Sequence, residues 1–115
     1  MNPLQFYKCL SDETRLRAIL LILQEQELCV CELVEALDES QPKISRHLAM
    51  LRKAGLLSDR KHAQWVFYQV NETLEPWIKN VLTISLQANQ TFIKEAKVKL
   101  DGMGERPARQ AECCK

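Results

Sequence analysis

A mainly α fold with one β-hairpin (an α+β chain) is the class that this sequence predicts, and three observations predict it. Apolar residues recur at helical spacing along most of the chain, and serines suited to N-caps precede two of these segments. The period changes to that of strands only between residues 56 and 70. A length of 115 residues, 46% of them hydrophobic and only 3 of them glycine, is typical of one globular domain.

Three short helices are expected in the first third of the chain. The first covers residues 3–9. Ser11 is the expected N-cap of the second helix, whose apolar positions from Leu16 to Leu23 follow the spacing i, i+3, i+4, i+7. The third covers residues 28–37, which read LCVCELVEAL.

A fourth helix is expected over residues 41–54. Ser40 is its N-cap, Pro42 falls in its first turn, and Gly55 stands where a left-handed C-terminal cap is wanted. Its buried stripe consists of Ile44, Leu48 and Leu51. Two short helices joined by a tight turn, the second of them basic, are typical of a helix-turn-helix.

Two strands, over residues 56–61 and 64–70, should form a hairpin after this helix. One long helix should follow, capped by Asn71 or Thr73, with an apolar stripe that continues to about Leu100. So small a domain is not expected to bury that whole stripe. This order of elements predicts a winged helix-turn-helix with two extra outer helices. Residues 1–101 would be the DNA-binding and dimerisation domain, and residues 102–115 a flexible tail.

The net charge of +1 conceals a strong asymmetry along the chain. Residues 1–39 carry a net charge of −5, whereas residues 40–62 carry six basic side chains against one acid, a net charge of +5. A basic segment of this kind favours a polyanionic partner such as DNA, although a solvated helix face would look the same.

Candidate DNA contacts lie off the buried stripe of the helix over residues 41–54. Arg46 can reach guanine edges or phosphates, and Gln41 can pair with adenine. Hydroxyl and ammonium groups suited to phosphates come from Ser40, Ser45 and Lys43, and His47 is expected on the same face. The hairpin would act as a wing through Arg60, Lys61 and Gln64.

The five cysteines fall into three groups: Cys9, Cys29 with Cys31, and Cys113 with Cys114. Their odd number favours reduced thiols, which act as soft-metal ligands or redox groups. Side chains two residues apart on a regular helix point about 200° apart. Cys29 and Cys31 can therefore share an ion only if Cys29 is an N-cap or the first turn unwinds. The alternative is that both are core thiols.

Enzymatic function is not expected. Neither histidine has an evident catalytic partner, and the sequence contains no phosphate-binding glycine loop. The longest apolar run, residues 18–23, is too short to cross a membrane, and no export signal appears, so a cytoplasmic protein is expected.

Four segments resemble the ArsR/SmtB family of metal-responsive repressors, in particular its arsenical-resistance branch. They read CLSDETRLRAILLIL, ELCVCELVEAL, SQPKISRHLAMLRKAGLL and DRKHAQWVFYQV. The resemblance implies a cytoplasmic homodimeric repressor that binds double-stranded operator DNA of an arsenic-resistance operon. It also implies release by arsenite or antimonite, and dimerisation through the first and last helices.

The resemblance assigns the inducer to Cys29 and Cys31. In the arsenical branch a third cysteine often follows three positions later, where this chain has Val34. A third sulfur would then come from Cys9, Cys113 or Cys114, of either subunit, or from a small exogenous thiol. An incidental role is the simplest interpretation of the Cys113–Cys114 pair.

Two other triggers stay open. Cadmium and lead sensors of the family share the paired cysteines and add N-terminal ones, of which this chain has only Cys9. Oxidation of Cys29 and Cys31 is the other alternative. A zinc trigger is not expected, because zinc sensors of the family use Asp and His ligands on the last helix, where this chain has no histidine.

Overall fold

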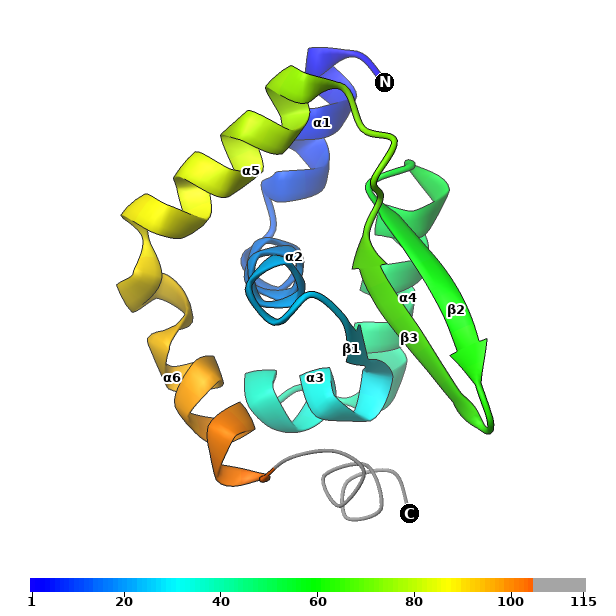
Figure 1. Ribbon diagram of the computed structural model, residues 1–115, viewed down its shortest axis with the longest axis vertical. Helices are drawn as coiled ribbons and strands as arrows, with labels where there is room; N and C mark the ends of the chain where they lie inside the picture. Colours follow the sequence, from blue (N-terminus) through cyan, green and yellow to red (C-terminus); the bar gives the residue numbers. More distant parts are fainter. Residues whose placement is uncertain (105–115) are drawn as a thin grey trace.

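The computed structural model describes residues 1–104 and confirms the mainly α class (Figure 1). This part of the chain holds six helices and a three-stranded sheet. In chain order the elements are α1 (Pro3–Leu10), α2 (Glu13–Glu25), β1 (Leu28–Cys29), α3 (Val30–Leu37), α4 (Gln41–Lys53), β2 (Leu57–His62), β3 (Trp65–Val70), α5 (Pro76–Ala88) and α6 (Gln90–Gly102). Of the expected tail, only residues 102–104 fall within the described part.

Helix α2 is the centre of the molecule. Figure 1 shows it end-on, with the other elements arranged around it. Its four consecutive residues from Ile19 to Ile22 are all buried, so apolar contacts reach it from every side. The other five helices and β3 all pack against it and complete one core.

The N-cap of α2 is Asp12, and the prediction of Ser11 was wrong. The Asp12 carboxylate accepts a hydrogen bond from the Arg15 backbone N–H at 3.0 Å. Ser11 instead ends α1, where its hydroxyl donates to the Lys8 carbonyl at 2.8 Å. Both side chains are suited to capping, but only one residue can hold the cap position, and helix α1 extends one residue further than expected.

Residues 28 and 29 form the strand β1 instead of the first turn of a helix, which corrects the prediction for residues 28–37. Leu28 pairs with Tyr68 and Cys29 with Phe67, so that β3 lies between β1 and β2 in an antiparallel sheet. The backbone of Cys29 is extended (φ −91°, ψ 168°), and α3 begins only at Val30. The predicted hairpin thus gains a third strand.

The predicted helix over residues 41–54 and the predicted hairpin are confirmed. Each of their ends lies within one residue of its predicted position. Ser40 caps α4, and its hydroxyl accepts from the Lys43 backbone N–H at 3.3 Å. Gly55 has a φ of +90°, the left-handed conformation that the cap requires. Strand β2 then pairs with β3 from Leu57↔Val70 to His62↔Trp65.

The last predicted helix is two helices, because the chain breaks at Asn89 (φ −129°, ψ 44°). The Asn89 amide donates to the Ser85 carbonyl at 2.9 Å and the Gln90 amide to the Leu86 carbonyl at 2.8 Å. These side chains satisfy the last carbonyls of α5, so that the helix can end there. Helix α6 folds back onto α2 and α3 and buries Ala96 and Leu100 of the predicted stripe, together with Ile93.

The start of α5 also differs from the prediction. Glu75 is the N-cap residue, with Pro76 at the first helical position. The Asn71 side chain instead joins two other segments, donating to the Gly55 carbonyl at 3.0 Å and accepting from the Thr73 N–H at 3.0 Å. It therefore closes the base of the hairpin against the end of α4.

Candidate nucleic-acid interface and cysteine pair

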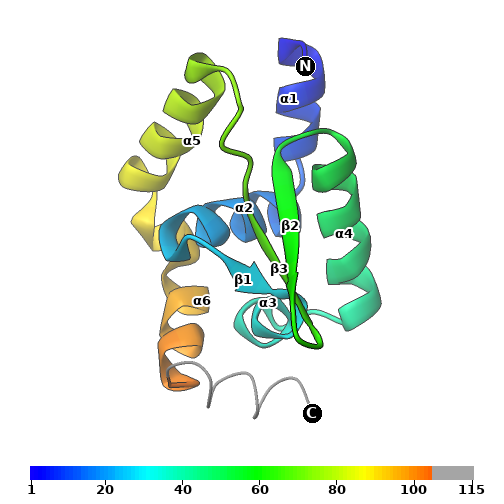
Figure 2. The same cartoon turned by 45° about the vertical axis from the view of Figure 1, so that its right-hand side comes forward.

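Helix α4 presents a polar face along its first two turns. Ser40, Gln41 and Arg46 are exposed, and Lys43 and Ser45 are half-buried. The opposite face is fully buried through Ile44, Leu48 and Leu51, as its spacing predicted. Figure 2 shows α4 standing beside the hairpin, so the two elements expected to meet DNA are neighbours.

His47 does not share that exposed face, contrary to the expectation from sequence. Its side chain is buried, with 8% of the residue exposed, and it faces the start of α2. The Arg15 guanidinium nitrogen Nη1 lies 3.3 Å from His47 Nδ1, and Asp12 Oδ1 lies 3.9 Å from Nε2. The stripe of apolar residues gave no sign of this, because the partners are on another helix.

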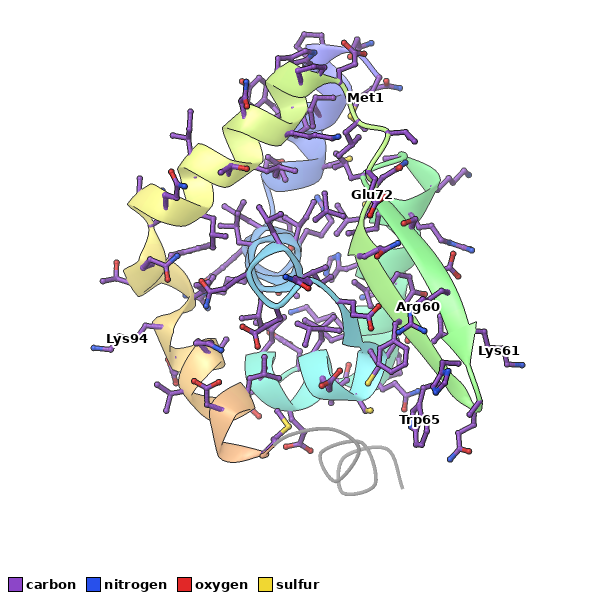
Figure 3. The ribbon with its side chains drawn as sticks, in the orientation of Figure 1. Met1, Arg60, Lys61, Trp65, Glu72 and Lys94 are labelled. Atoms are coloured by element: carbon purple, nitrogen blue, oxygen red, sulfur yellow. The ribbon has the colours of Figure 1, made fainter. Side chains whose placement is uncertain are left out.

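The hairpin places Arg60 and Lys61 on opposite faces of β2, as the pleat of a strand requires. In Figure 3 Lys61 extends away from the body of the protein, whereas Arg60 lies back across the sheet. The Arg60 guanidinium donates two hydrogen bonds to the Glu27 carboxylate, one of them from Nε at 2.9 Å. The same guanidinium lies over the Phe67 ring, 4.9 Å from its centroid. Lys61 and Gln64 are exposed near the hairpin end.

The two cysteines of residues 29–31 converge at the start of α3. Their Sγ atoms are 3.1 Å apart, because Cys29 has the extended backbone of an N-cap and Cys31 lies in the first helical turn. This is one of the two backbone arrangements that the i, i+2 spacing demanded. Cys29 is 2% exposed, whereas Cys31 is half-buried and takes part in a disulfide bond.

Glu32 and Glu27, which the sequence did not single out, hold this segment from two sides. Glu32 is fully buried, and its Oε1 accepts from the Cys29 backbone N–H at 2.9 Å. A glutamate three residues after an N-cap is half of a capping box, so the spacing could have revealed it. Glu27 precedes β1 and binds Arg60 of the hairpin, a contact with no local signal.

Of the other cysteines, Cys9 is a free thiol and is not part of this pair. In residues 1–104, no three Cys, His, Asp or Glu side chains are grouped to hold a metal ion. Cys9 is half-buried at the end of α1, and burial raises the pKa of its thiol. Cys113 and Cys114 lie outside the described residues.

An apolar surface remains on α1 and α5. Leu4, Tyr7 and Ile84 expose 65%, 53% and 63% of their surface. Between the two helices, Phe6 packs edge-on against Trp77, with ring centroids 5.2 Å apart. These two helices, the α1–α5 unit, therefore contact each other, and each of them exposes apolar side chains. No helix in residues 1–104 is long and apolar enough to cross a membrane.

A helix-turn-helix followed by a basic hairpin, all packed on one small core, defines a winged-helix DNA-binding protein. Residues 12–59 match the family model described as "Bacterial regulatory protein, arsR family". The chain is 50% identical to the arsenic resistance transcriptional regulator ArsR2 of Pseudomonas putida, over 99% of both chains. The chain belongs to the ArsR family.

Two further similarities agree with this assignment. The arsenical resistance operon repressor of Escherichia coli is 49% identical, over 80% of this chain and 79% of its own length. The reduced HlyU structure from Vibrio cholerae matches with a TM-score of 0.67 and 35% identity, covering 75% of this chain and 86% of that one. The protein is thus a DNA-binding transcription regulator of the arsenical-resistance repressor family and not an enzyme.

Proposed function

We propose that this protein is a homodimeric repressor that binds operator DNA of an arsenic-resistance operon and leaves it when arsenite or antimonite binds Cys29 and Cys31. Helix α4 would read the major groove through Gln41, Lys43, Ser45 and Arg46, with Ser40 on a phosphate. The hairpin would hold the neighbouring backbone through Lys61 and Gln64, and through Arg60 where it is free of Glu27.

The observation that carries the proposal is the 3.1 Å separation of the Cys29 and Cys31 sulfurs. Two sulfurs bound to one ion at about 2.3 Å each can be no more than about 4.6 Å apart. Once the disulfide bond of Cys31 is reduced, this pair therefore suits a shared soft ion. The rest of the first turn need not unwind to bring them together. Core packing alone does not require two thiols to meet at a helix start.

Two packed connections lead from the pair to the DNA-binding elements. Helix α3 leads into α4 through only three residues, 38–40, of which Asp38 is left-handed (φ +53°). Strand β1 is paired with β3 of the hairpin through Cys29 and Phe67. An ion bound by the two sulfurs that shifts β1 or the start of α3 would thus displace α4, the hairpin or both. A coupling of about 1–3 kcal/mol would weaken operator binding about 5- to 150-fold.

The third sulfur for trivalent arsenic is expected from outside the helix that carries the pair, because residue 34 is valine. Cys113 or Cys114 of either subunit, Cys9 of the partner subunit, or a small exogenous thiol are the candidates. Single replacements of these three cysteines by serine distinguish them, since only a true ligand changes the arsenite concentration needed for release.

Dimerisation is expected through α1 and α5, whose outer side exposes Leu4, Tyr7 and Ile84. Large apolar side chains that are this exposed favour an interface. A symmetric dimer would present two copies of α4 to half-sites about 10 base pairs apart, one turn of the duplex. The sequence predicted that one long helix, up to about Leu100, would form part of the dimer interface. Because α6 packs against α2 and α3 of its own chain, we expect it to contribute less to that interface than α5 does.

The test is release of reduced protein from a labelled duplex taken from upstream of its own gene. Anisotropy is followed while arsenite is titrated, and the titration is repeated with the double variant Cys29→Ser/Cys31→Ser. We expect release by arsenite in the wild type and none in the double variant, which should still bind the duplex. Serine caps helices well, so the start of α3 should survive the change.

Parallel titrations separate the alternative triggers. Release by cadmium or lead but not arsenite would move the protein to the divalent-metal branch of the family. Release by peroxide that thiol reverses, without release by arsenite, would make it a redox sensor. Salt-dependent binding that no trigger disturbs would leave DNA binding in place and contradict the inducer assignment.

A further inference from the structure

One guanidinium joins three helices at a point away from both the cysteine pair and the exposed face of α4. Arg15, in the first turn of α2, donates from Nε to the Cys9 carbonyl at 2.9 Å and from Nη2 to the Lys8 carbonyl at 3.3 Å. Both carbonyls belong to the end of α1, where helical carbonyls lack partners. Its remaining nitrogen, Nη1, lies 3.3 Å from Nδ1 of His47 on α4.

The chemistry of this contact fixes the state of the histidine. Arginine can only donate, so Nδ1 of His47 has to be the unprotonated acceptor nitrogen. The imidazole is then neutral, with its proton on Nε2, toward Asp12 Oδ1 at 3.9 Å. Burial agrees, since it lowers the pKa of His47 below its usual 6.5, with Arg15, Arg46 and Lys43 adding to the effect and Asp12 opposing it.

The contact also has a geometric consequence. Helix α1 is tied to α5 by the edge-on contact of Phe6 with Trp77 at 5.2 Å. Arg15 holds the other end of α1, and through His47 it holds the middle of α4. This bridge from Arg15 to His47 therefore fixes α4 relative to the α1–α5 unit, which carries the exposed apolar side chains.

We propose that Arg15 and His47 are positioning residues for operator recognition, setting the distance between the two α4 helices of a dimer. The proposal rests on the proposed function, in which α4 reads DNA and the α1–α5 unit dimerises. His47 then acts through the place of α4 and touches no base or phosphate. The histidine in the segment SRHL and the arginine in SDETR are the two halves of one bridge.

The experiment compares four single variants and the double variant His47→Leu/Arg15→Gln on operators that differ in spacing. His47→Leu and Arg15→Gln each remove one side of the bridge. His47→Asn is the conservative variant, because its amide oxygen can accept from Arg15 in place of Nδ1. Arg17→Gln is the matched control, since Arg17 lies on the same helix but stacks 4.7 Å from the Phe92 ring of α6. Thermal unfolding of each variant checks that it folds.

Affinity is measured on the footprinted operator and on versions with one base pair added to or removed from the spacer. Each base pair shifts a half-site by about 3.4 Å and rotates it by about 34°. We expect His47→Leu and Arg15→Gln to bind the native operator about tenfold more weakly and to lose most of the preference for native spacing. The double variant should be no worse than either single variant. His47→Asn and Arg17→Gln should keep the spacing preference.

Three results would overturn the proposal. A salt dependence of log K reduced by about 0.9 in His47→Leu would mean that His47 contacts a phosphate. An unchanged ratio of affinities across the three spacers would leave only a general structural role. Additive losses would mean that the two residues act separately. If the wild type itself failed to bind any of the duplexes, the proposed function would fall, and these comparisons would not be reached.

Discussion

Helices α3 and α4 both begin after a residue with extended backbone, but the two starts are built in opposite ways. Ser40 starts α4, and Gln41 and Arg46 after it are exposed to solvent. Cys29 starts α3 with 2% of its surface exposed, and Glu32 one turn later is fully buried. Only three residues separate the end of α3 from the start of α4.

The difference shows how each start can act. The start of α4 can meet a partner directly, because its side chains are already in solvent. Cys29 and Glu32 at the start of α3 offer almost no surface to DNA, so an event there can affect the operator only by moving packed neighbours. Packed elements shift between discrete arrangements instead of deforming smoothly, which suits a two-state regulator.

The largest effect on release by arsenite should come from adding a third cysteine to α3. Val34 lies three residues after Cys31, on the same side of the helix. Val34→Cys would supply a third sulfur within the chain, and we expect arsenite to release this variant at concentrations at least about tenfold lower, because binding becomes intramolecular. The measurement is the anisotropy titration with arsenite.

Val34→Ala is the control, since it makes a similar change in volume without a thiol. An unchanged response in Val34→Cys would mean that the inducer does not sit on this side of α3, or that a third sulfur is already in place.

Removing one exposed cation from α4 should give the next largest effect. Arg46→Ala should weaken operator binding by about 1–3 kcal/mol if Arg46 contacts a base, without changing the melting temperature. Arg52→Ala, in the last turn of the same helix and 3.5 Å from Asp59, is the matched control and should lose less. Equal losses from the two variants would remove Arg46 from the reading surface.

The Glu27–Arg60 pair tests whether the two regions communicate through the sheet. Glu27→Gln should change the free energy of unfolding by less than about 1 kcal/mol, because the pair is partly exposed. We expect arsenite to release this variant a few-fold less effectively, since the hairpin is no longer tied to the residue before β1. Glu25→Gln, which breaks the pair with Lys97 on α6, is the control. The same response in both variants would argue for transmission through α3 alone.

The smallest effect concerns pH and the bridge behind α4. Burial lowers the pKa of His47 in the folded protein below 6.5, so the unfolded chain binds more protons just below that pH. The contribution of His47 is therefore complete above pH 6.5 and is lost as the pH falls below it. Urea unfolding at about pH 5.5 and about pH 7.5 should show this loss in the wild type and less of it in His47→Asn. An equal loss in both would assign the pH dependence to other groups.

Local signals in the sequence were sufficient for most of the helix-turn-helix. The Ser40 cap, the stripe of α4 and the positive φ of Gly55 all follow from neighbouring residues, and the structure has them as predicted. The break at Asn89 was missed because the apolar spacing continues through it, and only the side-chain bonds of Asn89 and Gln90 end the helix.

The site shows the same limit. The spacing of Cys29 and Cys31 allowed two backbone conformations, an extended N-cap at Cys29 or an unwound first turn. The structure has the extended N-cap, in which Cys29 pairs with Phe67, 38 positions further along the chain. The burial of His47 depends on Arg15 and Asp12 of another helix. Contacts between distant segments leave no periodic signal, which is why these features could not be read from the sequence.

The most direct test of the account is reciprocal coupling between the inducer and the operator. The affinity of reduced protein for arsenite is measured twice, once alone and once saturated with the operator duplex. If arsenite at Cys29 and Cys31 drives release, the operator must weaken arsenite binding by the same factor by which arsenite weakens operator binding. Equal arsenite affinity in the two states would contradict the account, because the sulfur pair would then have no influence on α4 or the hairpin.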